Sequence, residues 1–145
     1  MRFFLLALAI LVLPGAAFAD TDSDTLAKFG LIGNWALDCR APPSLANPFE
    51  ALVLSKTGEE PTRHLNTGNP ALDRIEPVHD VILITADRLR LSYPQNAITV
   101  TVVFLKEDGR IRVLESTTSD GLTAVSGGII QRSGQQTAWL EKCPN

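Results

Sequence analysis

The sequence predicts an all-β protein: a single antiparallel β-barrel of about eight strands, connected as an up-and-down meander and closed by one disulfide. From residue 31 onward, short apolar runs recur about every ten residues, separated by Gly, Pro, Asn and Asp, which is typical of strands and turns. Two cysteines, Cys39 and Cys143, lie near the ends of this region. The apolar runs predict the strands, and the two cysteines predict the disulfide that closes the barrel.

The N-terminus has the features of a secretory signal peptide. Arg2 supplies a positive charge, an unbroken apolar run extends from Phe3 to Leu13, and Ala17 and Ala19 place small residues where a signal peptidase cleaves. The run is shorter than the roughly 20 residues that a membrane-spanning helix needs. We therefore expect cleavage after Ala19, a periplasmic or secreted location, and no membrane span in the mature chain. A retained membrane anchor is the alternative.

The chain accordingly divides into a cleaved segment, a short leader and one domain. The leader is polar and then weakly helical up to Gly30, which favours one helical turn capped by Ser23 or Asp24. The remaining length suits one hydrophobic core. The predicted organisation is a signal peptide at 1–19, an N-terminal leader at 20–30 and a β-barrel domain at 31–145.

The composition disfavours several partners and chemistries. The formal net charge is -3 at pH 7, which gives no electrostatic footprint for nucleic acid or anionic membranes. Both histidines, His64 and His79, lie outside metal-binding motifs. The sequence also contains no G-x-S-x-G and no S-x-x-K motif, which are signatures of nucleophilic catalysis. We therefore predict no metal, no cofactor and no enzymatic activity.

Alternation of apolar and polar residues locates the strands of the domain. Successive side chains of a strand point to opposite faces, so one face of each strand is apolar. The predicted strands are 33–39, 49–54, 62–65, 72–76, 79–85, 88–93, 98–105, 110–117, 122–131 and 136–142.

The four central strands can be aligned with one another as a meander. The connecting segments are 86–87, 94–97 and 106–109, all of ordinary hairpin length. A slip of one residue would turn Arg88 and Arg90 into the core, so the apolar pattern disfavours it. The predicted opposite pairs are Ile84 with Leu89, Leu91 with Val100, Val102 with Val113, and Phe104 with Ile111.

This alignment places polar side chains on both faces of the sheet. On the inner face, Asp80 and Tyr93 share the last row and Glu115 lies beside Val100. These three polar residues are therefore candidates for lining a lumen or binding a ligand. The alternative for Glu115 is a position at the mouth of the barrel, where its carboxylate reaches water.

The outer face carries the cationic cluster of the sequence. Arg88, Val103 and Arg112 form one row, and Arg90 and Arg110 lie nearby. This cluster is a candidate surface for an acidic partner or a phosphate. The alternative is that the charges only keep the sheet soluble and oppose edge-to-edge pairing.

Each cysteine follows a tryptophan in its terminal strand. Export to an oxidising compartment favours a disulfide between Cys39 and Cys143, and buried free thiols are the alternative. If the first and last strands pair, this bridge clamps the seam of the barrel. Trp35 and Trp139 either seal the small core or offer a platform for a ligand.

The residues Gly33-Asn34-Trp35 resemble the G-x-W motif that begins the first strand of lipocalins and other calycin barrels. The resemblance implies that Trp35 closes one end of an eight-stranded barrel and that an Arg from near the last strand, here Arg132, packs across it. In size and layout the chain also resembles bacterial periplasmic barrels that inhibit lysozymes or proteases. Neither resemblance identifies a function, because one fold serves many functions.

These observations favour two functions. The first is a periplasmic or secreted interaction module, either inhibitor-like or an accessory protein of the envelope, with an unknown protein partner. The alternative is a lipocalin-like carrier or sensor of a small apolar ligand. The carrier requires a hollow lumen, and eight-stranded barrels lie at the border between filled and hollow.

Overall fold

The computed structural model describes residues 21–54 and 60–144. The predicted signal peptide and its cleavage site lie outside the described residues. Within the described part, no helix is long and apolar enough to cross a membrane.

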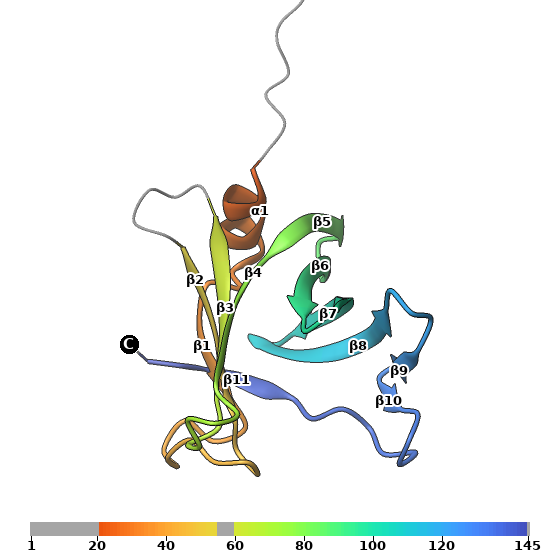
Figure 1. The fold of residues 1–145 in the computed structure, drawn as a ribbon. Coiled ribbons are helices and arrows are strands. Elements are labelled where there is room, and N and C mark those ends of the chain that lie inside the picture. The colour runs from red at the N-terminus through yellow and green to blue at the C-terminus, as the bar shows by residue number, and fades with distance from the viewer. Residues whose placement is uncertain (1–20, 55–59, 145) are drawn as a thin grey trace, which may run out of the picture.

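One helix precedes a series of strands (Figure 1). The helix and strands, in chain order, are α1 (Asp22–Phe29), β1 (Gly33–Ala36), β2 (Phe49–Leu54), β3 (Pro61–Asn66), β4 (Arg74–Pro77), β5 (His79–Thr85), β6 (Arg88–Gln95), β7 (Ile98–Glu107), β8 (Arg110–Thr118), β9 (Thr123–Ser126), β10 (Ile129–Ile130) and β11 (Leu140–Cys143).

The strands form one antiparallel sheet that curls into a nearly closed barrel (Figure 1). The order of strands in its wall is β4-β3-β2-β1-β11-β8-β7-β6-β5, and β9 and β10 form a hairpin beside β8. β11 therefore joins the first strand to the rest. β4 and β5 are the two ends of the sheet, although only Val78 separates them along the chain. The predicted all-β antiparallel barrel with an up-and-down meander is confirmed.

Helix α1 begins at a capping box. The hydroxyl of Thr21 accepts a hydrogen bond from the amide of Asp24 at 3.2 Å, and the carboxylate of Asp24 accepts one from the amide of Thr21. The prediction of one turn capped by Ser23 or Asp24 is wrong, because the cap lies earlier and the helix is longer. Reciprocal capping of this kind satisfies two backbone donors at the start of a helix.

The helix covers one end of the barrel (Figure 1). Its side chains Leu26 and Phe29 are buried in the core, as is Leu31 directly after it. Burial of this apolar side stabilises a helix that would be too short to form alone. The core that they join comprises Leu26, Phe29, Leu31, Trp35, Leu52, Val78, Val81, Leu89, Leu91, Tyr93, Val100, Val102, Phe104 and Ile111.

The disulfide connects the turn that follows the first strand to the last strand of the domain. Cys39 and Cys143 are bonded, with their Cα atoms 5.2 Å apart. β1 pairs with β11, and Asn34 lies opposite Cys143. The predicted disulfide is confirmed, and it joins the two ends of the barrel domain beside the β1–β11 pairing, whereas the open side of the barrel lies between β4 and β5.

Two turns of the meander are shorter than predicted. β6 and β7 are joined by Asn96 and Ala97, and β7 and β8 by Asp108 and Gly109. Asn96 has φ 55°, Asp108 has φ 50° and Gly109 has φ 74°, the left-handed backbone that two-residue hairpin turns favour.

The shorter turns change the pairing of the central strands. Leu91 lies opposite Val102, and Phe104 lies opposite Val113. The predicted partners Val100 and Ile111 are therefore wrong by two positions, which keeps the apolar side chains of β6 and β7 on their predicted face. Ile84, which was also predicted on the inner face, is 50% exposed. At the edge, Leu83 rather than Ile84 lies opposite Leu89, because β5 is bulged against β6.

The C-terminal strands are shorter than the sequence predicts. The predicted strand 122–131 is a hairpin, because Gly127 at φ 59° and Gly128 at φ 75° turn the chain between β9 and β10. The predicted strand 136–142 is reduced to β11, which begins at Leu140. The predicted strand 33–39 likewise ends early, at Ala36.

Candidate functional site

Four arginines lie on the outer face of strands β6 and β8. Arg88 and Arg112 share a row with Leu105 between them, since each lies opposite Leu105. Arg90 lies opposite Val103 in the next row. Arg110 lies two residues before Arg112 on the same face of β8. We call Arg88, Arg90, Arg110, Arg112 and Trp139 the arginine face.

The composition of these rows differs from the prediction in one respect. Val103 lies between Arg90 and Glu115, and not between Arg88 and Arg112. The predicted inner position of Glu115 is wrong, because a bulge between Val103 and Phe104 turns the second half of β8 by one residue. The carboxylate of Glu115 instead accepts a hydrogen bond from the amide of Gly127 at 2.8 Å.

Trp139 lies on this outer face and not in the lumen, contrary to the prediction. The guanidinium carbon atoms of Arg110 and Arg112 lie 5.2 and 4.7 Å from the centre of its ring. Its neighbour Leu140 packs against the core, so Trp139 on the alternate side faces outward. Cation–π contacts of this kind hold arginine side chains in a defined orientation.

Arg112 is held more firmly than the other three arginines. A Cβ atom added to Gly128 would lie 3.5 Å from the guanidinium carbon of Arg112, so this glycine lies close against the guanidinium that Trp139 also contacts. The Nε atom of Arg112 is buried and has no hydrogen-bond partner in the described part of the chain. The guanidinium of Arg112 is therefore packed between Trp139 and Gly128.

The arginines of the arginine face form no close ion pair within the described part of the chain, although carboxylates lie beside them. Glu107 and Glu141 lie opposite Arg110 on the two neighbouring strands, and Asp87 adjoins Arg88. Two nearby carboxylates also have other partners: Glu115 accepts from the amide of Gly127, and Glu141 from the amide of Cys39 at 3.1 Å. Because guanidinium groups bind carboxylates through paired hydrogen bonds, this surface suits an acidic partner.

A second polar cluster lies inside the barrel and was not predicted. Arg63 on β3 donates from Nε to Glu50 on β2 at 2.8 Å and from Nη1 to Glu76 on β4, also at 2.8 Å. A further bond joins its Nη2 to Glu50. Arg63 and Glu76 are 9% and 7% exposed, so this is a buried ion triad that connects three neighbouring strands.

Tyr93 connects this triad to the opposite wall of the barrel. The guanidinium carbon of Arg63 lies 4.5 Å from the centre of the Tyr93 ring, which β6 contributes. Burial would lower the pKa of Arg63, but Glu50, Tyr93 and Glu76 together raise it above its ordinary value, and the guanidinium remains charged. The triad and Tyr93 therefore bridge the gap between β4 and β6 near the open seam.

Tyr93 should titrate at unusually high pH. Burial raises the pKa of its phenol above the ordinary value of 10.0, Glu50 and Glu76 add to this effect, and Arg63 opposes it. The folded state then favours the neutral phenol, so its stabilising contribution is complete below pH 10 and is lost as pH rises through the higher folded pKa.

The chain contains one tyrosine, so tyrosinate absorbance reports on Tyr93 alone. We expect the absorbance of the native protein to rise only at pH values above those of the unfolded chain, and Tyr93→Phe to reduce the alkaline loss of stability. A native titration at or below the unfolded value would contradict the buried placement.

The predicted lumen residues differ in their positions. Tyr93 and Trp35 are buried at 9% and 2%, and the indole of Trp35 donates to the carbonyl of Leu31 at 2.7 Å. Asp80 is exposed at a bulge with φ 53° and bonds His79 at 2.9 Å, so its predicted contact with Tyr93 is wrong.

The side chain over Trp35 is also not the one that the resemblance implies. The Nζ atom of Lys142 lies 5.6 Å from the centre of a Trp35 ring, and it donates to the carbonyl of Gly30 at 3.1 Å. Arg132 lies beyond β10 and borders a surface groove with Leu122. Lys142 therefore occupies the position expected for Arg132.

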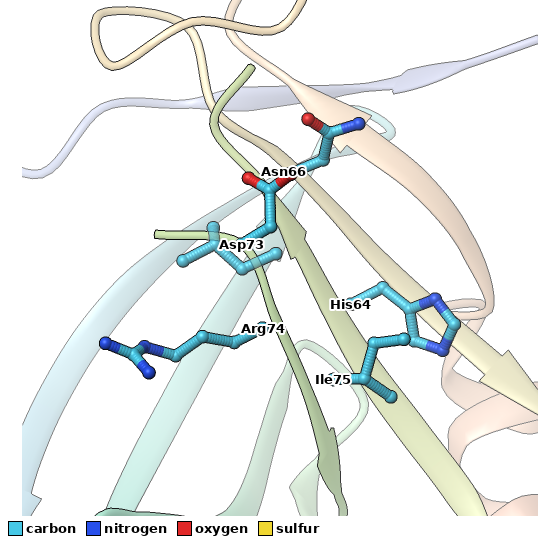
Figure 2. Close-up of a pocket in the computed structure, with 6 residues that line it drawn as sticks. His64, Asn66, Asp73, Arg74 and Ile75 are labelled. Atoms are coloured by element: carbon cyan, nitrogen blue, oxygen red, sulfur yellow. The ribbon is translucent and has the colours of Figure 1, made fainter. Parts of the chain in front are cut away.

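Two hollows lie on the surface of the described residues, away from the core. One, of about 290 Å³, lies at the β3–β4 hairpin, where His64 and Ile75 lie together and Arg74 points away from them (Figure 2). The other, of about 590 Å³, is an apolar groove along the β9–β10 hairpin. Neither is lined by residues of the buried hydrophobic core.

In comparisons with known proteins, no protein-family model, no curated protein and no solved structure matches this chain. The inference about function therefore rests on the geometry of the site.

Proposed function

We propose that this protein is an exported interaction module that binds an acidic protein surface through the arginine face. One observation carries the proposal: four arginines lie together, unpaired, beside a partly exposed tryptophan in a chain whose formal net charge is -3. Such a chain has enough carboxylates to neutralise its arginines. The lack of a close ion pair at these four arginines therefore favours an external acceptor.

The chemistry of the arginine face supports protein binding in particular. Arginine and tryptophan are enriched among the residues that contribute most to protein–protein interfaces. Arg112 is already oriented by Trp139 and Gly128, so little side-chain entropy is lost when it binds a carboxylate. Leu105 and Val103 add apolar area between the charges. The proposal assigns a binding role to the protein and no catalytic one.

The proposed location is the periplasm or the extracellular space. The disulfide between Cys39 and Cys143 persists in an oxidising compartment, and the N-terminal sequence has the features of a signal peptide. A small, disulfide-bonded barrel in that location suits an inhibitor of a foreign hydrolase or an accessory subunit of an envelope complex. Either of these roles depends on the surface of the protein and needs no lumen.

The packed interior argues against the alternative, a lipocalin-like carrier of a small apolar ligand. A carrier needs a cavity among its inward side chains. Here the side chains of α1 and of both walls pack against one another, and the polar end of the interior holds the Arg63 triad. An apolar ligand would have to displace either a close-packed core or a buried ion cluster.

Site-specific photocrosslinking tests the proposal. A photoreactive phenylalanine analogue is placed at Leu105, between Arg88 and Arg112, in the protein expressed in its native host. We expect one discrete crosslinked protein whose contacting surface is acidic. The product should disappear when Arg88 and Arg90 are both replaced by Glu, and it should weaken as ionic strength rises.

Two matched controls make the result specific to this face. The same analogue at Leu72, an exposed position outside the arginine face, should give no such product. Reversing Arg40 and Arg132, two exposed arginines elsewhere, changes the net charge equally and should leave the product intact. Loss of the product in both charge-reversed variants, or in neither, would overturn the proposal.

A further inference from the structure

The arginine face has apolar side chains in its middle and positive charge on both sides of them. On the middle strand, β7, Val103 and Leu105 are half-buried and belong to the outer face. On one side, β6 contributes the exposed side chains of Arg88 and Arg90. On the other side, β8 contributes Arg112, opposite Leu105. Across three neighbouring strands the surface is therefore charged, apolar and charged again.

The carboxylates opposite the arginines are concentrated at one end of this surface. Glu107 and Glu141 lie opposite Arg110, one on each neighbouring strand. By contrast, the strand between Arg88 and Arg112 has an apolar residue at the position opposite both of them. An acidic partner is therefore best accommodated over these two arginines and less well over Arg110.

Two other carboxylates near the surface accept hydrogen bonds within the protein. Asp87, which adjoins Arg88, accepts from the hydroxyl of Thr85 at 2.6 Å. Glu115 accepts from the amide of Gly127 at 2.8 Å. Neither forms a close ion pair with an arginine of this surface, so the guanidinium groups keep donors for an external carboxylate.

We propose that the acidic partner contacts this surface with an amphipathic α-helix that lies along β7. This inference rests on the proposed function and names the kind of segment that the arginine face accepts. A stripe of apolar side chains on the helix packs against Val103 and Leu105. Acidic side chains on both sides of that stripe pair with Arg88 and Arg90 on β6 and with Arg112 on β8.

The width of the surface matches a helix. Neighbouring strands lie about 4.8 Å apart, so the backbones that carry Arg88 and Arg112, on either side of β7, lie about 9.6 Å apart. An α-helix with its side chains is about 10 to 12 Å across. Residues that flank the apolar stripe of a helix, as at the e and g positions of a coiled coil, therefore lie above the two outer strands.

The spacing along the strand matches as well. Arg88 and Arg90 are two residues apart on β6, which corresponds to about 6.8 Å. Residues four positions apart on one side of a helix are separated by about 6 Å along its axis. Two acidic residues at positions i and i+4 can therefore each reach one of these arginines.

A strand laid on the same surface could not make these contacts. Its side chains alternate between two faces, so only one line of residues would point toward the arginine face. That line could be apolar or acidic, but it could not place acidic residues on both sides of an apolar one. An amphipathic helix presents the apolar stripe and both of its polar borders on one side.

Fluorescence anisotropy with labelled synthetic peptides tests the helix. The probe is a helical peptide of about five turns, with leucines along one stripe and glutamates on both borders of the stripe. We expect it to bind the mature, oxidised protein at low ionic strength at least tenfold more tightly than two peptides of the same composition. In one of these the glutamates lie on the helix face opposite the leucines, and in the other leucine and glutamate alternate with period two.

Variants of the protein locate the contact. Arg88→Gln and Arg112→Gln should each weaken binding of the helical probe at least fivefold. Leu105→Thr should also weaken it, because it removes apolar contact area and keeps a residue that suits a strand. Arg40→Gln, at an exposed arginine outside the arginine face, is the matched control and should leave binding unchanged. Circular dichroism confirms that each variant is folded.

The outcomes separate this inference from the proposed function. If the helical probe binds no better than either comparison peptide, or equally well to Arg88→Gln and Arg40→Gln, the helix is overturned, even where photocrosslinking at Leu105 captures an acidic partner. If photocrosslinking captures none, the proposed function fails, whatever the peptides do.

Discussion

Replacing Arg63 with alanine is expected to lower the free energy of unfolding by about 3 to 5 kcal/mol. The substitution leaves Glu50 and Glu76 without their shared cation inside the barrel, and an uncompensated buried charge is strongly destabilising. It also removes the contact with Tyr93 that connects β3 to β6. Urea unfolding at neutral pH, followed by circular dichroism, measures the change.

Two further variants identify the cause of this loss. Arg74→Ala, at an exposed arginine on the neighbouring strand β4, should change stability by less than about 0.5 kcal/mol. In the Arg63→Ala background, replacing both Glu50 and Glu76 by Gln should recover part of the loss, because the buried charges are removed. If Arg63→Ala cost no more than Arg74→Ala, the triad would not stabilise the fold.

Replacing both Cys39 and Cys143 with serine is expected to lower the free energy of unfolding by about 4.7 kcal/mol in the chain-entropy model. The bridge spans a sequence separation of 104 residues, so it restricts nearly the whole described chain when the protein is unfolded. Loss of this restriction should also separate β1 from β11 first, since their short pairing is adjacent to the bridge. Urea unfolding again measures the loss.

Reduction of the unaltered protein provides the control for this variant. Dithiothreitol should lower the stability of the unaltered chain to that of the serine variant and should leave the serine variant unchanged. Amide hydrogen exchange should show the earliest loss of protection in β1 and β11. Equal stability of the oxidised and reduced protein would contradict the role assigned to the disulfide.

The sequence contains enough information to predict the barrel because its strands alternate strongly. In β6 and β7 every second residue is apolar, so the face of each residue is determined even where the partner is not. The pairing was predicted two positions away because two-residue turns at Asn96 and Asp108 require left-handed backbone, which the longer predicted loops do not. A shift of two positions keeps each side chain on the same face of the sheet, so the apolar pattern is the same for both pairings.

The errors in the candidate site have local causes. A single bulge between Val103 and Phe104 moves Glu115 to the outer face, and bulges are not visible in a pattern of period two. A period of two places Trp139 on the same face as Cys143 and so predicts that it faces inward, but β11 begins only at Leu140. Its inward neighbour Leu140 pairs with Ile111 and fills that place.

The Arg63 triad could not be predicted without the pairing of β2, β3 and β4. Glu50, Arg63 and Glu76 are polar residues in segments where polar residues normally face water. Only the register, with Leu52 opposite Arg63 and Arg63 opposite Glu76, brings them to the inner face. The sequence does contain one indication of this cluster. Glu50 shares a face of its strand with the apolar Leu52, so its carboxylate faces inward, where a buried charge requires a positively charged partner. The four arginines of the arginine face, by contrast, follow from alternation alone, because they lie in the strands β6 and β8.

Native mass spectrometry of the mature protein, purified from its own host without denaturation, tests most directly whether the protein acts through its surface and not through its interior. We predict the mass of the oxidised chain, as monomer or dimer, or that mass bound to a protein partner, with no small molecule retained. A small molecule that is present in stoichiometric amount and leaves on collisional activation would contradict the account, because it would require a cavity among core side chains that pack against one another.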